Sequence, residues 1–520
     1  MADAAPLAAP PPTRGAAALA LTMSTLAFTI CFAAWMLNGV LATFLVDRGV
    51  FAWDKSQLGW LIGIPVLTGS LARLPVGVLT DRYGGRVVFA GVMLLSAVPL
   101  WLLSYADSFG AYAWASLGFG LVGSSFAVGI AYTSLWFGKN RQGTALGVFG
   151  AGNAGAAITS MLAPQLLERL TDGGADLDGW RALPRIYAVV LVGMAVVFGL
   201  VARTRIVAGG ATTGLRRRLA PLAQVRVWRF GLYYFLVFGG YVALAQWLLP
   251  YYVNVYGTSL ATAGLLAAIF SLPSGVIRAL GGWASDRFGA RRAMYWVLGS
   301  CVAGFLLLCV PRMEIKSPGG GVMAFRAGTV TEVTPERVVV GGTSYALRPP
   351  VASGHSVGGA DDDVLVWPKG TTWHDPIVKV GDVVKKKQLL ARGTTQVYFQ
   401  ANIWIFTAIL FAVGMMMGVG KAAVYKHIPE YFPANVGVVG GIVGVLGGLG
   451  GFACPILFGT LLEATGIWTS CWAFFLALSV VCLVWMHSVV RRMIRERAPG
   501  VAEHLESAGA TAGAAPSWRA

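Results

Sequence analysis

Two arginines with matching sequence surroundings lie inside long apolar stretches of the chain. One begins the segment Arg73–Arg86 (RLPVGVLTDRYGGR), and the other begins Arg278–Arg291 (RALGGWASDRFGAR), 205 residues later. An arginine within the hydrocarbon of a bilayer costs about 2.5–3.5 kcal/mol or more, so two at equivalent positions need an explanation. A guanidinium presents a planar fork of donors that suits a planar oxyanion. The pair therefore predicts a site at which two arginines hold one small anion.

The alternative is that a carboxylate of the protein neutralises each arginine. The apolar stretches contain no Asp or Glu, and the nearest acidic residues fall at their ends: Asp47, Glu168 and Glu463. We therefore expect a bound anion to supply the missing negative charge.

The elements that position these arginines are expected to be transmembrane helices. Of the 520 residues, 56% are hydrophobic and only 12% are charged, whereas a soluble domain has about 25% charged residues. A helix needs about 20 apolar residues to cross the hydrocarbon, and a β-barrel would show shorter alternating segments. Suitable stretches occur at about residues 17–46, 56–79, 87–105, 111–136, 144–166, 182–202, 229–252, 260–281, 293–311, 398–420, 437–460 and 468–488.

The repeated segment predicts two structurally related halves. An arginine, a glycine, an Asp-Arg pair, an aromatic residue, a second glycine and a last arginine all recur at the same offset. Such repeats are typical of transporters built from two parallel halves. We expect an all-α membrane protein of twelve transmembrane helices, with one six-helix half at 16–202, a cytoplasmic linker at 203–228, and a second half made of 229–311 and 401–488.

The basic residues indicate how the chain is oriented. The formal net charge is +17, and the arginines and lysines concentrate in alternate loops. Because cytoplasmic loops carry an excess of these residues, topology explains the charge without a nucleic-acid partner. We predict a multi-pass protein of the inner (plasma) membrane with both termini cytoplasmic, as a disordered tail at 1–15 and a second tail at 489–520. No cleaved signal peptide is expected.

A polar segment at 312–400 interrupts the second half between the ninth and tenth spans. Its composition predicts strands at 328–333, 337–343 and 364–366, and the alternation of loops puts it on the periplasmic side. The stretch VKVGDVVKKKQLL, Val378–Leu390, resembles the V-x-x-G-D-x-V-x-x-G-Q-x-L stretch of biotinyl/lipoyl-type β-barrels. The hairpin lysine that carries the cofactor in those barrels is not evident. We expect a small, β-rich, barrel-like insertion and no cofactor.

Metal, disulfide and enzyme chemistry are not expected. The six cysteines lie in apolar runs without paired spacing, which is typical of buried small hydrophobic residues. We interpret His374 and Asp375 as part of a turn, and Asp361–Asp363 as a solvated loop. No nucleophile–base pair or metal constellation is evident, so the sequence does not predict an enzyme.

The segment Gly77–Arg86, GVLTDRYGGR, resembles the cytoplasmic loop motif of the major facilitator superfamily. A weaker copy occupies the equivalent place in the other half. The resemblance implies the major facilitator fold and a gating role for these residues: Gly77, Asp81, Arg82, Arg86, Asp286, Arg287 and Arg291. We expect Asp81 to cap a neighbouring helix and the arginines to bind carboxylates across the bundle.

Two glycine-rich runs occupy equivalent spans of the two halves, GVFGAGNAG at Gly147–Gly155 and GVVGGIVGVLGGLGGF at Gly437–Phe452. Glycines at three- and four-residue spacing let helices approach closely. Both runs resemble the paired signature motifs of the nitrate/nitrite porter (NarK-type) family. So do the sequences around three aromatic residues: Trp35, Phe126 and Tyr234. The resemblance covers the chain apart from the polar segment.

This resemblance implies a nitrate or nitrite site shared by the two halves. Arg73 and Arg278 are implied to clamp the anion, and Phe126 and Phe238 to sandwich it. Hydrogen-bond donors and glycine backbone complete the implied site: Tyr234, Asn153, Gly152 and Gly448. Without the resemblance, the aromatic residues alone would be interpreted as core or lipid packing. The expected partners are nitrate, nitrite and the lipid bilayer, and we expect a monomer.

One position departs from the family pattern. Where the family often has G-x-G-N-G, this chain has GVGKA, Gly418–Ala422. We interpret Lys421 as a lysine that snorkels to the membrane interface. The alternative is that its charge lies in the exit path or takes part in coupling.

Several hypotheses about function remain open. The leading one is nitrate import by alternating access. The lack of carboxylates in the spans favours nitrate/nitrite exchange, and proton symport stays an alternative. A carrier for another small oxyanion or organic anion would also fit two arginines. A different class would be a membrane-anchored sensor or carrier protein that acts through residues 312–400.

Overall fold

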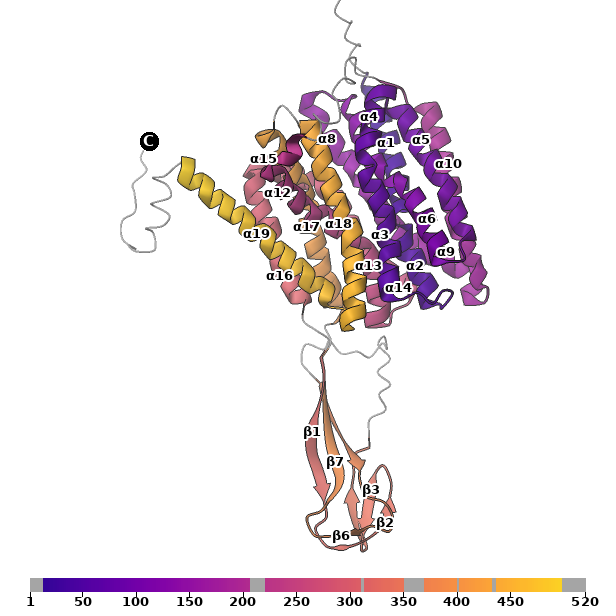
Figure 1. Cartoon of the computed structure of the whole chain (residues 1–520), viewed down its shortest axis with the longest axis vertical. Helices are drawn as coiled ribbons and strands as arrows, with labels where there is room; N and C mark the ends of the chain where they lie inside the picture. Colours follow the sequence, from indigo (N-terminus) through magenta and orange to yellow (C-terminus); the bar gives the residue numbers. More distant parts are fainter. Residues whose placement is uncertain are drawn as a thin grey trace, which may run out of the picture. The chain divides into compact units, whose positions relative to one another are not determined.

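A computed structural model describes residues 13–205, 220–309, 313–349, 369–399, 402–432 and 436–497 of the 520-residue chain. The chain divides into two compact units (Figure 1). The first, here called the helical unit, comprises Met1–Tyr251, Leu260–Leu306 and Leu410–Ala520. The second comprises Tyr252–Ser259 and Leu307–Ile409.

The helical unit consists of α-helices (α) and of short 3₁₀ or π-helical segments (η). In the first half of the chain they are α1 (Arg14–Trp35), α2 (Leu37–Asp47), α3 (Lys55–Leu71), α4 (Arg73–Tyr83), α5 (Gly85–Leu102), η1 (Leu103–Tyr105), α6 (Phe109–Phe119), η2 (Gly120–Ser124), α7 (Ser125–Ser134), α8 (Lys139–Gly150), η3 (Ala151–Ala154), α9 (Gly155–Leu170), η4 (Asp172–Gly174), η5 (Leu177–Arg181) and α10 (Ala182–Val201). In the second half they are η6 (Ala220–Ala223), α12 (Val225–Tyr234), η7 (Phe235–Gly239), α13 (Gly240–Tyr256), α14 (Leu260–Val276), α15 (Arg278–Phe288), α16 (Ala290–Leu308), α17 (Ile403–Tyr431), α18 (Val436–Thr465) and α19 (Ser470–Arg497).

Eleven helical stretches of the described chain are long and apolar enough to cross a membrane. The stretch predicted at 260–281 is not among the eleven, because α14 (Leu260–Val276) is a shorter apolar helix of 17 residues; α15 follows it after Ile277. The remaining predicted spans each coincide with one of the eleven, with ends that differ by several residues.

The 205-residue repeat extends from the sequence into the helix boundaries. α3 and α14 each have 17 residues, α4 and α15 each have 11, and each pair is offset by 205. α4 and α15 both end at a glycine with positive φ, Gly84 at 82° and Gly289 at 86°, a conformation that other residues adopt at a cost. The repeat therefore encodes the same helix–break–helix unit twice.

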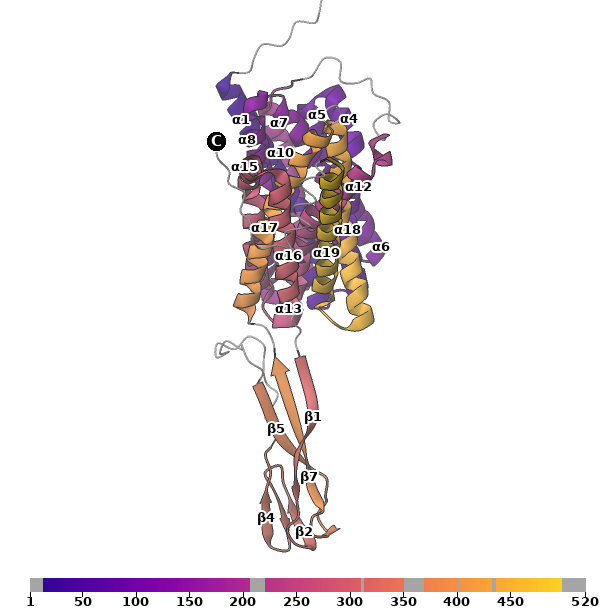
Figure 2. The ribbon, with the colours of Figure 1, turned by 90° about the vertical axis from the view of Figure 1, so that its left-hand side faces the viewer.

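Glycines set the distance between the two halves. α18 lies beside α3 (Figure 1), and a Cβ on Gly63 of α3 would lie 2.6 Å from the carbonyl oxygen of Phe452. The equivalent pair, α9 and α14, is in similar contact, since a Cβ on Gly264 would meet the carbonyl oxygen of Ser160. Elsewhere in the unit α16 and α17 run side by side (Figure 2), with Val297 against Gly420. Such close backbone approach is typical of membrane helices packed through small residues.

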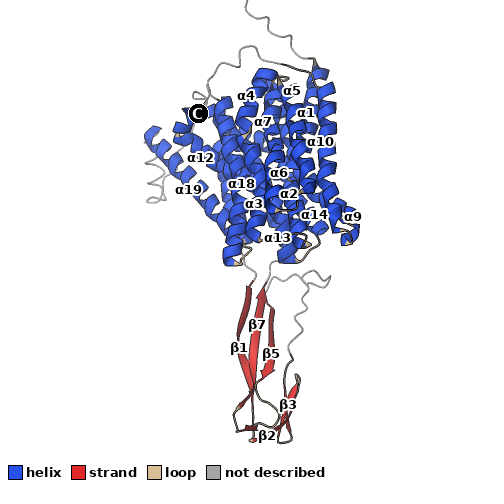
Figure 3. Cartoon of the chain, turned by 45° about the vertical axis from the view of Figure 1, so that its right-hand side comes forward, coloured by secondary structure: helices blue, strands red, loops and turns tan. Residues whose placement is uncertain are grey.

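The second unit contains all the described strands, red in Figure 3. One antiparallel sheet has the order β1 (Met313–Met323), β7 (Leu389–Phe399), β5 (Lys369–Pro376); the other has the order β4 (Thr343–Ala346), β3 (Arg337–Val340), β2 (Gly328–Val333), β6 (Val383–Val384). A two-residue turn of Gly341 and Gly342, both with positive φ, joins β3 to β4. Val330, Val338, Tyr345 and Leu390 belong to one buried core.

The strands and the turn predicted within residues 312–400 agree with the structure only in part. β2 coincides with the stretch predicted at 328–333. β3 covers only the first four residues of the stretch predicted at 337–343, because Gly341 and Gly342 form a turn. His374 and Asp375 lie in strand β5, and the prediction of a turn there is wrong. No group of three or more His, Cys, Asp or Glu side chains in the described chain is placed to hold a metal ion.

Other predicted features lie outside the described residues. These are most of the tail at 1–15, the middle of the linker at 203–228, the strand at 364–366, the loop Asp361–Asp363 and the last residues of the tail at 489–520.

Candidate functional site

The two repeat-related arginines meet at one aromatic ring. Arg73 is the first residue of α4 and Arg278 the first residue of α15, so each follows a break between two helices. Their guanidinium carbons lie 5.5 and 5.2 Å from the centroid of the Phe126 ring. Arg73 is only 5% exposed. The structure thus brings together two cations that are distant in sequence, and cation–π contacts with the same ring favour both.

The guanidinium groups of Arg73 and Arg278 have buried N–H groups that donate no hydrogen bond to a described residue. Arg73 donates one hydrogen bond from Nη1 to the carbonyl oxygen of Gly444, at 2.6 Å. Its Nε and Nη2 atoms, and Nη1 of Arg278, are buried and have no hydrogen-bond partner among the described residues. Because buried donors without partners cost free energy, these N–H groups indicate a polar ligand.

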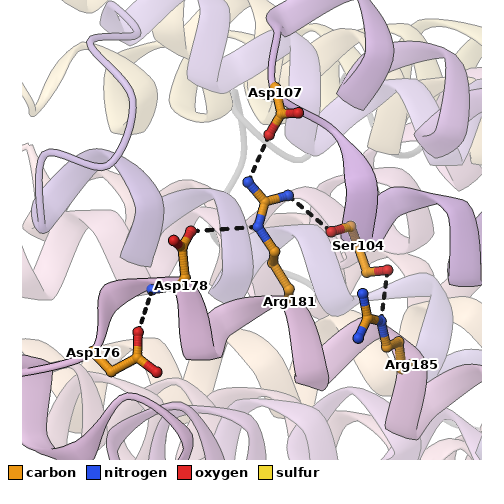
Figure 4. Close-up of polar contacts among 6 residues, drawn as sticks. All are labelled: Ser104, Asp107, Asp176, Asp178, Arg181 and Arg185. Carbon is orange, nitrogen blue, oxygen red and sulfur yellow. Dashed lines mark hydrogen bonds and ion pairs between the residues drawn. The ribbon is translucent and has the colours of Figure 1, made fainter.

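An arginine elsewhere in the chain shows the contrasting, satisfied state (Figure 4). Arg181, at the end of η5, donates from Nη2 to Asp107 at 2.6 Å and from Nε to Asp178 at 3.4 Å. Its Nη1 donates to the carbonyl oxygen of Ser104 at 2.9 Å. In the part of the chain that the structure describes, no carboxylate lies within ion-pair distance of Arg73 or Arg278.

The predicted aromatic pair lies at this site. The rings of Phe126 and Phe238 are 6.3 Å apart between centroids and inclined by 23°. Arg73 lies against the second ring too, 5.2 Å from its centroid. Tyr234 stacks on Phe238 at 5.0 Å and 9°. Three of the residues implied by the family resemblance therefore surround the Arg73 guanidinium or its neighbouring ring.

The site coincides with irregular turns in three helices. Phe126 follows the 3₁₀ segment η2, Asn153 lies in the 3₁₀ segment η3, and Phe238 lies in the π-helical segment η7. Such interruptions of α-helices often occur at functional sites, where they redirect side chains and backbone groups.

Asn153 is buried, and its amide nitrogen and oxygen have no partner among the described residues. It lies against α14, since a Cβ on Gly275 would be 3.4 Å from its Cβ. Its backbone carbonyl accepts a hydrogen bond from the Tyr241 hydroxyl at 3.3 Å. One turn earlier, a Cβ on Gly150 would lie 3.2 Å from Cδ of Arg278. Gly150, the residue that precedes η3, therefore borders Arg278.

The two predicted glycines differ in their surroundings. A Cβ on Gly448 would lie 3.4 Å from Nη1 of Arg73 and would overlap Ser70. A Cβ on Gly152 would instead overlap the ring of Phe28 on α1. Gly448 thus lies at the arginine site, whereas Gly152 allows helix packing beside it.

Two residues at the arginine site, Tyr425 and Gly444, were not predicted from the sequence. Tyr425 of α17 lies 5.7 Å from the guanidinium carbon of Arg278 and edge-on to Tyr234 at 5.0 Å, and its hydroxyl donates to the carbonyl of Gly440. Gly444 supplies the carbonyl that holds Arg73. The available signal for Tyr425 was its position four residues after Lys421, which places both on one helix face.

Lys421 lies elsewhere than predicted. The helix expected to end at 420 continues to Tyr431, so Lys421 is inside α17 rather than at its end. The side chain is 0% exposed, and Nζ lies 3.3 Å above the centroid of the Tyr241 ring. The interpretation as a snorkelling lysine is therefore wrong.

The repeated loop motif makes contacts other than those expected of its arginines. Arg86 donates from Nε, at 2.7 Å, and from Nη2 to the carbonyl oxygen of Gly199 on α10. Arg291 donates to the hydroxyl of Tyr431, and Arg287 lies over the Trp283 ring. Among the described contacts, the expected carboxylate partners are thus replaced by a helix-terminal carbonyl, a hydroxyl and a ring. The side chain of Asp286 lies outside the description.

Paired helix units around a shared polar site, repeated at one sequence offset, are the architecture of a two-half membrane carrier. Comparison with known proteins supports this class. The Major Facilitator Superfamily model matches residues 23–331. A bacterial homolog of the human lysosomal transporter Spinster, in an inward-facing and occupied conformation, has a similar fold, with a TM-score of 0.59 at 13% identity over 92% of this chain and 98% of that chain. The nucleoside transporter NupG aligns with a TM-score of 0.55 at 12% identity over 90% of this chain and 98% of that chain.

Among sequence relatives, a protein of Thermus thermophilus named "Probable nitrate/nitrite antiporter NarK1" is 38% identical over 94% of this chain and 95% of its own length. A "Probable nitrate/nitrite transporter NarK2" of Mycobacterium tuberculosis is 31% identical over 66% of this chain and 91% of its own length. A "Nitrite extrusion protein" of Bacillus subtilis is 23% identical over 90% and 94%. The chain belongs to the NarK-type nitrate/nitrite porters of the major facilitator superfamily, and it is a carrier rather than an enzyme.

Proposed function

We propose that this protein carries nitrate and nitrite across the inner membrane by alternating access, and that the anion binds between Arg73 and Arg278. The observation that carries the proposal is the meeting of both guanidinium groups at the Phe126 ring with buried N–H groups unused. Nitrate and nitrite are planar oxyanions of a size that suits a guanidinium fork. The names of the relatives from Thermus and Mycobacterium support this choice of substrate.

The charges of the two arginines give alternating access a physical cause. Arg73 and Arg278 belong to different halves, and their like charges repel each other. In the low dielectric of a membrane protein this repulsion opposes closure of the empty site. A bound anion attracts both guanidinium groups and lets the halves close around it. The glycine contacts of α3 with α18 and of α9 with α14 offer smooth surfaces for that movement.

The proposed topology has twelve membrane-spanning segments in two halves of six, with α14 and α15 together forming the eighth. Both termini are cytoplasmic in this proposal, and residues 312–400 form a periplasmic insertion. The loops rich in arginine and lysine support this orientation. We propose that a single chain is the transporting unit.

Reconstitution in liposomes tests the function. We expect the purified protein to take up labelled nitrate when the liposomes contain nitrite, because a carrier that is reset by an anion needs one on the far side. Arg73→Ala and Arg278→Ala should each reduce uptake by about 100-fold or more, the loss typical of a buried charge–charge hydrogen bond worth about 3 kcal/mol. Arg492→Ala, at an exposed position, is the control.

Competition in the same assay tests the substrate class. Excess unlabelled nitrate or nitrite should suppress uptake, whereas formate and acetate should not. Uptake that an organic anion suppresses as well as nitrate does would assign the carrier to other anions, and full uptake by an Arg73→Ala, Arg278→Ala double variant would refute the site.

A further inference from the structure

Lys421 is a third cation beside the arginine site, and nothing in the proposed anion clamp requires it. Its Nζ atom has no hydrogen-bond partner among the described residues, and its described contact is the face of the Tyr241 ring at 3.3 Å. Its charge and that of Arg278 repel each other. An ammonium that is buried without a counter-ion costs free energy. This cost indicates that Lys421 has a role in transport.

The elements packed against this turn of α17 supply no carboxylate among their described contacts. The described neighbours of residues 417–420 are Gly240 on α13, Ser274 on α14, Ile277 in the break, Gly281 on α15, Val237 in η7 and Val297 on α16. Among the described residues, the titratable or charged groups that face Lys421 from other elements are Tyr241 on α13 and Arg278 on α15. On α17 itself, Tyr425 and His427 follow one and nearly two turns later, and Arg278 lies over the Tyr425 ring. The protonation of the Lys421 amine therefore depends mainly on the charge at the arginine site.

A chain of contacts connects this lysine with the anion site. Tyr241, whose ring lies under Lys421, donates its hydroxyl to the backbone carbonyls of Asn153, at 3.3 Å, and Ser271, at 3.2 Å. Asn153 lies in η3, and Gly150, which directly precedes η3, lies against Arg278. An anion held by the arginines lowers the positive potential at Nζ. Anion binding and protonation of the amine then favour each other, because linked equilibria are reciprocal.

We infer that Lys421 is the proton-carrying group of the transport cycle, which gains a proton when the anion binds and loses it when the anion leaves. The inference rests on the proposed function and extends it to coupling. A hydronium ion in the water at the entry face gives its proton to the neutral amine, which becomes an ammonium, and leaves water. Water at the exit face takes the proton back. One proton then travels with each nitrate, although the apolar stretches predicted from the sequence contain no carboxylate to carry it.

The experiment uses full-length protein in liposomes without a membrane potential and measures nitrate in two modes. In the first, an inward proton gradient of one pH unit is applied, and one-to-one coupling should support about tenfold accumulation of nitrate, since one pH unit is a factor of ten in proton activity. In the second, pH is equal and internal nitrite drives exchange. Lys421→Asn removes the amine, Lys421→Arg keeps a charge that does not deprotonate, and Arg492→Ala is the control.

The expected result is that both Lys421 variants exchange nitrate for nitrite but no longer accumulate nitrate against the gradient. Accumulation by Lys421→Asn equal to the wild type would overturn the inference, and so would a wild type that exchanges but ignores the gradient. Loss of exchange in both variants would assign Lys421 to anion binding and also refute proton carrying. A wild type inactive in both modes would instead refute the proposed function itself.

Discussion

The guanidinium of Arg73 can donate five hydrogen bonds, and its only described hydrogen bond is the one to Gly444. The Arg181 guanidinium, in contrast, has an acceptor at each nitrogen and two carboxylates within 4 Å. In the same chain, Arg181 is held by contacts within the protein, whereas Arg73 has N–H groups free to bind a ligand. At the scale of single residues, this difference is the main evidence that Arg73 binds a ligand.

A change at Phe126 tests the aromatic contribution. Phe126→Leu keeps apolar volume but removes the ring that faces both arginines. A cation–π contact is worth about 0.5–2 kcal/mol, so the loss of one such contact should raise the half-saturating nitrate concentration for uptake by about 2- to 30-fold.

Phe89→Leu is the matched control, since this buried ring pairs with Phe198 on α10. If the two variants had the same half-saturating concentration, the ring of Phe126 would have no special role in holding the arginines.

Breaks and interruptions of helices determine where the site residues point. Arg73 and Arg278 begin helices after breaks, and three further predicted residues lie in or directly after η2, η3 and η7. Hydropathy cannot predict these interruptions, because each one leaves the apolar composition of its span unchanged. The repeated break before Arg73 and Arg278 is visible in sequence only as a repeated motif.

A substitution at Gly63 tests the close contact between helices α3 and α18. Gly63→Ala would place a Cβ 2.6 Å from the carbonyl oxygen of Phe452, closer than van der Waals contact. We expect the midpoint of thermal unfolding to fall and nitrate uptake to drop about tenfold or more, because overpacking costs about 1–3 kcal/mol.

Gly91→Ala on α5 is the control for helix propensity, since a Cβ there has no atom within 4 Å. Alanine favours a helix over glycine by about 0.8–1 kcal/mol, so this variant should be slightly more stable than the wild type. A gain in stability at Gly63 as well would contradict the close contact of the two helices.

Much of the helical unit and of its site follows from the sequence. The repeat predicts that the second and eighth spans are equivalent, and the paired arginines follow from their cost in a membrane. The break that divides each of these spans into two helices was not predicted. Lys421 was misplaced because snorkelling depends on where the helix ends, and α17 continues for ten residues beyond it. Tyr425 was missed because its contacts with Arg278 and Tyr234 depend on how three helices pack, which periodicity does not encode.

At the scale of the whole molecule, the strand-rich segment is an addition that the transport proposal does not need. Its first and last strands pair antiparallel, with Met313 opposite Phe399, so the two ends of the segment are neighbours. A short Gly/Ser linker can therefore replace residues 314–398. We expect this deletion to leave nitrate uptake within about twofold of the wild type, a change of less than about 0.5 kcal/mol.

The deletion also distinguishes a transporter from a membrane-anchored sensor or carrier protein that acts through residues 312–400. A protein that acted as a sensor or carrier through this segment would lose its activity, although the helical unit would still insert and remain monodisperse in detergent. Retained uptake supports a carrier whose function resides in the helices.

Equilibrium binding of labelled nitrate to the purified protein measures the anion site separately from membrane insertion, coupling and turnover. We expect saturable binding of one nitrate per chain. Arg73→Lys or Arg278→Lys should lower the affinity by about tenfold or more, since lysine keeps the charge but loses the fork. Binding of nitrate with unchanged affinity after both arginines are replaced by alanine would show that Arg73 and Arg278 do not form the anion site.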